Sequence, residues 1–245
     1  MGIRENEAIY LPEVMLDLET WGKPNLTTCP AFFAIGAVRF STQPPEIFLP
    51  RLVDDHGVEI IGSTQTSDWF YSLVDMRSTK VSGLEFDADT IYWWFNQPPE
   101  AQEELRRSGE SGLSLLKVLT EFSAWLENGA KFWHSLGSEI GFWDHHEYRI
   151  WAHGEDFDIP ILRSAYLNSG IALPKWERHC FRDTRTLFSV TPGFDQATFF
   201  PSTPVEHHAL YDAWRQAVAV QRCCQQLHEC SLNFSCSQLF KDDKP

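Results

Sequence analysis

The sequence predicts an α/β fold in which one mixed sheet is covered by helices, in a chain of 245 residues. Two strand-like apolar segments open the chain, and helical periodicity dominates after residue 87. A short strand followed by a helix then appears late in the chain. Strands first, then helices, then strand-helix alternation is typical of such a sheet. A length of roughly 150 residues per domain permits one large domain. Without repeats or a linker, we expect a single domain over 1–245, with a core of about 13–228.

The first predicted strand covers Glu13 to Thr20, where polar and apolar residues alternate. The second covers Ala31 to Phe40, a nearly continuous apolar run typical of a strand buried on both faces. A third is predicted at Glu46 to Val53, where Pro50 favours an edge position. Their spacing predicts a meander of three antiparallel strands.

Two short helices are predicted next, at Asp87 to Asn96 and Glu100 to Arg107, separated by two prolines. Leu113 to Glu127 has apolar residues at helical spacing, which predicts a helix with one buried face. The stretch 131–149 is rich in Gly, His and Trp. We interpret it as an insertion, either on the surface or as a flap or subunit contact.

A short strand at Arg149 to His153 leads into a helix at Phe157 to Asn168. The last helix has a strong start signal, because Thr203 to Glu206 forms a capping-box sequence with Pro204 at the first helical position. It is predicted to run to about Leu227. The tail 241–245 is predicted to be disordered.

Composition limits the classes of function. The net charge of -14 argues against a broad footprint on duplex DNA, which needs clustered basic residues. It leaves a nucleic-acid enzyme possible, because carboxylates loaded with cations become electropositive. The longest uncharged run, 24–38, is shorter than the roughly 18 residues of a membrane span, and the first ten residues lack a signal-peptide core. The six cysteines show no paired spacing and read as reduced thiols, which predicts a cytoplasmic protein.

The first candidate site segment is Asp17-Leu18-Glu19. Residues i and i+2 of a strand share a face, so both carboxylates lie roughly 6–7 Å apart along it. Two acids on the covered face of a strand are costly unless something neutralises them, and Mg²⁺ or Mn²⁺ prefers carboxylate oxygens. The alternative is an edge strand with solvated acids.

The second segment ends in Asp158, which is expected in the first turn of a helix just after a strand. It is either a third acid at a metal centre or a carboxylate favoured by the helix dipole. Spacing alone does not choose among Glu155, Asp156 and Asp158.

The third segment contains His207, His208 and Asp212. Imidazole is suited to taking a proton from water near neutral pH. Helix geometry alone pairs His208 with Asp212, four residues apart on one face. The alternative is a solvated surface helix.

Together the segments Asp17-x-Glu19, Phe157-Asp158 and His207-x-Ala-x-x-Asp212 resemble the DEDDh 3'-5' exonucleases, the proofreading-subunit-like branch of the ribonuclease H-like superfamily. The blocks DTIYWWFNQ, WAHGEDFDIPILRSAY, RDTRTLF and EHHALYDAWRQA are similar to the ribonuclease AS and exonuclease VIII-like enzymes of phages and bacteria. The resemblance covers about residues 14–220. It implies a ribonuclease H-like mixed central sheet, with three antiparallel strands followed by parallel strands, flanked by helices.

The resemblance implies a metal-dependent 3'-5' exonuclease that shortens single-stranded or 3'-overhanging DNA or RNA to nucleoside 5'-monophosphates. Asp17, Glu19, Asp158 and Asp212 would hold two divalent ions, Mg²⁺ or Mn²⁺, in two-metal hydrolysis. His207, rather than His208, would be the general base. A homodimer is also implied.

Thr20, Trp21 and Trp94 are candidate substrate contacts, because they follow the metal acids or belong to an aromatic run with Trp93 and Phe95. Aromatic faces stack well on bases. Two rivals remain: a non-catalytic nucleic-acid-binding module on the same fold, and a phosphodiesterase acting on dinucleotides.

Overall fold

The computed structural model of the chain describes residues 13–24, 29–42, 64–65, 69–136, 149–174 and 180–239. The elements in chain order are β1 (Glu13–Thr20), β2 (Phe32–Phe40), β3 (Thr64–Gln65), β4 (Trp69–Leu73), α1 (Met76–Val81), α2 (Ala88–Trp94), α3 (Pro99–Ser111), α4 (Leu115–Leu136), β5 (Arg149–Ala152), α5 (Glu155–Asn168), β6 (Phe181–Asp183), α6 (Thr184–Val190), α7 (Gln196–Phe199) and α8 (Ala209–Leu239).

The strands form one mixed sheet in the order β3-β4-β2-β1-β5-β6. Strands β3, β4, β2 and β1 pair antiparallel, whereas β1, β5 and β6 pair in parallel. The predicted mixed sheet flanked by helices is therefore confirmed. The strand predicted at 46–53 lies outside the described residues, and the antiparallel neighbour of β2 is β4, which the sequence analysis missed.

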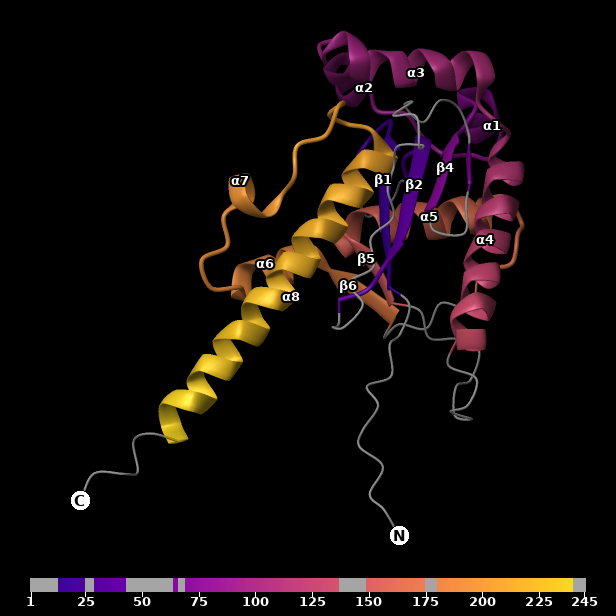
Figure 1. Cartoon of the computed structure of the whole chain (residues 1–245). Coiled ribbons are helices and arrows are strands. Elements are labelled where there is room, and N and C mark those ends of the chain that lie inside the picture. The colour runs from indigo at the N-terminus through magenta and orange to yellow at the C-terminus, as the bar shows by residue number, and fades with distance from the viewer. Residues whose placement is uncertain are drawn as a thin grey trace, which may run out of the picture.

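Helices cover both faces of the sheet. Helix α8 crosses one face over β1 and β2, and α5 packs behind β1 and β5 (Figure 1). Every residue of β2 is buried, as its apolar sequence predicts for a strand covered on both faces. The carboxyl end of β1 thus lies between the start of α5 and the start of α8.

Gly36 of β2 permits the closest approach between sheet and helix. It pairs with Asp17 across the ladder between β1 and β2. A Cβ at Gly36 would lie 2.3 Å from backbone atoms of Ala209 and Leu210, closer than real Cβ atoms approach other atoms. The missing side chain lets the first turn of α8 rest directly on the sheet beside Asp17.

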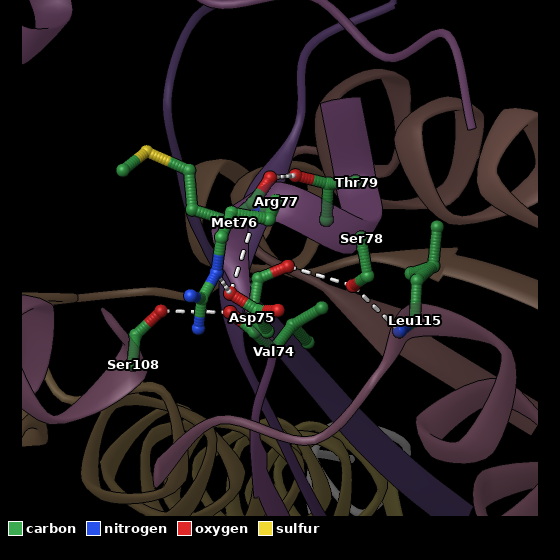
Figure 2. A network of polar contacts seen from close by, with 8 residues as sticks. All are labelled: Val74, Asp75, Met76, Arg77, Ser78, Thr79, Ser108 and Leu115. Carbon is green, nitrogen blue, oxygen red and sulfur yellow. Dashed lines mark hydrogen bonds and ion pairs between the residues drawn. The ribbon is translucent and has the colours of Figure 1, made fainter. Parts of the chain in front are cut away.

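A network of polar contacts fixes α1, α3 and α4 around the end of β4 (Figure 2). Asp75 caps α1 by accepting from the backbone N–H of Arg77. The Ser78 hydroxyl accepts from the backbone N–H of Leu115 at 2.9 Å, which ties α1 to the start of α4. The hydroxyl of Ser108 donates to the carbonyl of Val74 at 2.7 Å and holds α3 against the sheet.

Several helix ends differ from the prediction. Helix α8 begins at Ala209 rather than Pro204, because the Thr203 hydroxyl donates to the Val205 carbonyl instead of capping a helix. Helix α4 continues through Leu136, well past Glu127. Residues 137–148 of the predicted insertion and the tail 241–245 lie outside the described residues.

Among the helices that the structure describes, none combines the length and the hydrophobicity of a membrane span.

Candidate active site

The five residues of the predicted site come together from three elements. Asp17 and Glu19 lie on β1, Asp158 lies in the first turn of α5, and Asp212 lies in the first turn of α8. His207 stands just before α8. One ligand atom from each of Glu19, His207 and Asp212 can be chosen so that all three lie within 4.8 Å of one another.

Asp17 points toward α8, as the strand alternation predicts. Its carboxylate Oδ1 accepts a hydrogen bond from Gln216 Nε2 at 2.8 Å. Its neighbours Leu16 and Leu18 are buried in the core. Because β1 alternates, Glu19 shares the face of Asp17 and lies one step nearer the end of the strand.

At the carboxyl end of β1, the side chain of Asp158 bonds to backbone that no described strand pairs with on that side. The parallel pairing of β1 with β5 covers only Glu13 to Met15. Further along, the carboxylate Oδ1 of Asp158 accepts the backbone N–H of Leu18 at 3.1 Å. Asp158 is buried, whereas Glu155 and Asp156 in the same turn are exposed. The structure therefore resolves which of the three acids faces β1.

Asp212 is held by the start of α8. Its backbone N–H donates to the carbonyl of His208 at 2.8 Å, in the first turn of the helix. Its carboxylate Oδ1 lies 3.0 Å from Arg215 Nε, one turn along the same helix. The positive charge of Arg215 acts to lower the pKa of both Asp17 and Asp212, against the larger effect of burial.

The two histidines have different environments. His207 has a left-handed backbone, with φ of 58°, and its ring lies edge-on to Trp93 and Trp94 at centroid distances of 5.0 and 5.9 Å. The ring of His208 is buried instead against Tyr71, where the two rings stack at 4.6 Å. The pairing of the His208 ring with Asp212 expected from helix geometry is wrong, because this ring packs against Tyr71 and it is the His207 ring that lies beside Asp212.

The four carboxyls of the site have too little positive charge nearby to offset their burial and their mutual repulsion. Burial, followed by repulsion from neighbouring carboxylates, raises the pKa of Asp17 and of Glu19 well above the usual range. Burial raises the pKa of Asp158 to about 8, and it also raises the pKa of Asp212. Four crowded carboxyls of this kind favour a divalent cation, for which oxygen ligands are preferred. The donor set therefore fits Mg²⁺ or Mn²⁺.

The predicted base contacts of Trp21 and Trp94 are wrong, because both side chains are buried. The two side chains are 4% and 2% exposed and pack on Phe33, so neither ring offers a face to a base. Trp94 Nε1 donates to the carbonyl of Thr20 at 2.9 Å. The exposed ring beside His207 belongs to Trp93.

The hydroxyl of Thr20 is also engaged within the protein. It donates to the carbonyl of Gly22 at 2.8 Å, in the turn that ends β1. Thr20 therefore fixes this turn, and a substrate contact from its hydroxyl would need that hydrogen bond to break.

Three residues of the site were missed from the sequence. Arg215 and Gln216 follow Asp212 by three and four residues, so helical spacing could have placed them on its face. Glu104 of α3 is buried next to His208 and acts electrostatically on Glu19. No local pattern distinguishes it from the other acids of its helix.

The sequence and the fold of this chain both resemble those of known proteins. A family model described as the 3'-5' exoribonuclease Rv2179c-like domain matches residues 12–224. No curated protein sequence matches the chain.

Two solved structures share the fold. One is the crystal structure of cell-death related nuclease 4 (CRN-4), at 14% identity and a TM-score of 0.54, covering 89% of this chain and 64% of that chain. The other, described as 3'-end specific recognition of histone mRNA stem-loop by 3'-exonuclease, has 12% identity and a TM-score of 0.52, covering 91% and 67%. This chain thus spans less than two thirds of the length of CRN-4.

Proposed function

The chain belongs to the family of 3'-5' exoribonuclease Rv2179c-like domains. From this premise we propose that it is a metal-dependent 3'-5' exonuclease that shortens single-stranded or 3'-overhanging RNA to nucleoside 5'-monophosphates. The observation that carries the proposal is the convergence at the end of β1 of four carboxyls, three buried and Asp17 half-buried, with the His207 ring. The family's description supports RNA over DNA. Its match over 12–224 supports a single exonuclease domain.

Asp17, Glu19, Asp158 and Asp212 would hold the divalent ions. Bound ions would stabilise the attacking and leaving oxygens of an in-line displacement at phosphorus. In the metal-free protein, burial and the repulsion among these carboxyls raise their pKa values, and a bound cation would relieve that repulsion.

His207 would take the proton of the attacking water. Its ring is only half-buried, and it lies beside Glu19 and Asp212, where a water at the metal site would be within reach. Imidazole is the side chain that most often serves as a general base in such steps. His208 could not replace it, because burial lowers the pKa of His208 to about 3 and its ring faces away from the acids.

Trp93 would receive the 3'-terminal base. Its side chain is 44% exposed and its ring contacts that of His207. Tyr92 and Phe95 on either side are 72% and 63% exposed. A base stacked on Trp93 would hold the terminal phosphodiester near the acids.

The homodimer and the close kinship with ribonuclease AS and exonuclease VIII-like enzymes stay predictions.

The test is an oligonucleotide degradation assay. RNA and DNA labelled at the 5' or 3' end are incubated with the protein and Mg²⁺, Mn²⁺ or EDTA. We expect stepwise loss from the 3' end of RNA, abolished by EDTA and by Asp158→Ala. Binding without shortening would favour the non-catalytic module, and cleavage confined to dinucleotides would favour the small-substrate phosphodiesterase. Preferential shortening of DNA would contradict the proposed substrate.

The variants His207→Ala and His208→Ala test which of the two imidazoles is the general base. We expect turnover to fall roughly 10²- to 10⁴-fold in His207→Ala, the range lost with a general base. His208→Ala should cost much less. A larger loss in His208→Ala than in His207→Ala would show that the wrong ring has been assigned as the base.

A further inference from the structure

His208 caps helix α8 with its imidazole ring. Ala209 is the first helical residue, so His208 holds the N-cap position. Its Nδ1 accepts from the backbone N–H of Tyr211 at 3.5 Å, the same donor that Ser, Thr, Asp or Asn satisfies at an ordinary N-cap. The cap decides where the helix begins, and it leaves His207 outside the helix.

The other ring nitrogen of His208 faces a buried acid. Because Nδ1 accepts, the hydrogen of the neutral ring lies on Nε2, which is 3.3 Å from Glu104 Oε1. The hydroxyl of Tyr71 donates to the same carboxyl oxygen. Tyr71, Glu104 and His208 are 1%, 2% and 4% exposed, so no solvent competes for these contacts. We call these three residues the capping triad.

Glu104 is itself held in place by the rest of α3. Ser108, one turn further along this helix, donates to the carbonyl of Val74 at the end of β4 (Figure 2). The sheet thus fixes α3 through Val74, and it also supplies Tyr71 from β4. Two contacts with one strand set the position of the Glu104 carboxyl.

His207 needs such support, because its backbone has an unfavourable conformation. It is the one non-glycine residue with a positive φ in the part of the chain that the structure describes. Left-handed backbone at a residue with a side chain persists where the surroundings impose it. Here the left-handed backbone turns the His207 ring toward Glu19 and Asp212. The side chain of His208 packs against Tyr71 instead.

We propose that Tyr71, Glu104 and His208 are positioning residues, which hold His207 in its left-handed conformation and so aim its ring at the metal-binding acids. This inference rests on the proposed function of His207 as the base. The buried polar contacts at Glu104 Oε1 specify one geometry in a way that apolar packing does not. The capping triad acts through His207 and touches no substrate.

The test compares Glu104→Leu with Glu104→Gln. Glutamine keeps an oxygen that can accept from the Tyr71 hydroxyl and lie against His208 Nε2, and it resembles the neutral form of the acid, whose pKa burial raises to about 8. Leucine removes the acceptor. Glu100→Leu, an exposed position in the first turn of the same helix, is the control. Each variant is assayed on single-stranded RNA at a temperature well below its own Tm.

We expect Glu104→Leu to lower kcat roughly 10- to 100-fold with KM within about twofold, the loss typical of a misplaced catalytic group. Glu104→Gln and Glu100→Leu should keep kcat within about threefold. If Glu104→Leu keeps kcat within threefold, or Glu104→Gln loses as much as Glu104→Leu, the inference is wrong. If Glu104→Leu does not fold, His208→Asn replaces it, because asparagine caps but is too short to reach Glu104. A tenfold loss of kcat then supports the inference, and any smaller loss overturns it.

A second readout is independent of activity. The Cε1–H resonance of His207, assigned by its loss in His207→Ala, should move in Glu104→Leu and stay in place in Glu104→Gln. An unmoved resonance in both variants overturns the inference. If the native protein degrades no nucleic acid, the proposed function fails, whereas the position of the His207 ring is still tested by this signal.

Discussion

Replacing Asp158 by asparagine is predicted to stabilise the metal-free protein while abolishing its exonuclease activity. Burial raises the pKa of Asp158 from 3.8 to about 8. The folded state therefore holds a proton that the unfolded chain releases at neutral pH. A carboxyl with a raised folded-state pKa costs no stability below pH 3.8, and its cost grows as the pH rises toward 8.

The size of the effect follows from these two pKa values. At pH 7 the group is about 3 pH units above its ordinary pKa, and each unit corresponds to about 1.4 kcal/mol. The cost to folding is thus about 4 kcal/mol at pH 7 and about 2 kcal/mol at pH 5. Asparagine carries no proton to release, and its Oδ1 can still accept the N–H of Leu18.

The assay is urea unfolding in EDTA at pH 5 and pH 7, followed by circular dichroism. Asp158→Asn should unfold at higher urea concentration than the native protein, with a larger advantage at pH 7. Asp156→Asn, an exposed acid in the same turn, is the matched control and should change the free energy of unfolding by less than about 0.5 kcal/mol. An advantage that is equal at both pH values, or absent, would refute the electrostatic reasoning.

Three further predictions concern the same site. Adding Mg²⁺ or Mn²⁺ at about 100 times its dissociation constant should stabilise the native protein by about 2.7 kcal/mol. By differential scanning fluorimetry this is a rise in Tm of roughly 5–10 °C, and Asp158→Asn should show a clearly smaller rise. Gly36→Ala should lower the free energy of unfolding by about 3 kcal/mol and abolish activity, because its Cβ would displace the start of α8. Gly109→Ala, where a Cβ meets nothing within 4 Å, should be neutral or stabilising in the same urea titration. Trp93→Ala should raise KM for RNA at least about fivefold through lost stacking without lowering Tm, whereas Tyr92→Ala should leave KM within twofold. An unchanged KM in Trp93→Ala would remove Trp93 from the substrate site.

The strands that carry the site were predictable because their signals are local. The alternation around Asp17 and Glu19 predicted β1, and the apolar run that follows predicted β2. Strand β6 has only three residues, all partly exposed, so no periodicity could develop in it. Its place in the sheet depends on pairing with β5, a contact that sequence patterns do not encode.

The start of α8 shows where local signals fail. The sequence from Thr203 to Glu206 matches a capping box, yet the helix begins at Ala209. Docking at Gly36 and the imidazole cap of His208 set its first residue, and both depend on distant elements. For the same reason helix geometry wrongly favoured His208 over His207. A single left-handed residue before a helix leaves no periodic trace in the sequence.

The acids of the site are spread along most of the polypeptide. The hydrogen bond between Gln216 and Asp17 joins residues that are 199 positions apart in the sequence, and that between Leu18 and Asp158 joins residues 140 positions apart. Contacts this distant in sequence form late in folding, because long loops must close first. During synthesis, a ribosome-bound chain that has not yet exposed Asp212 holds only part of the acidic cluster. The acidic cluster is therefore complete only once the segment that carries Asp212 has been synthesised and has folded onto β1.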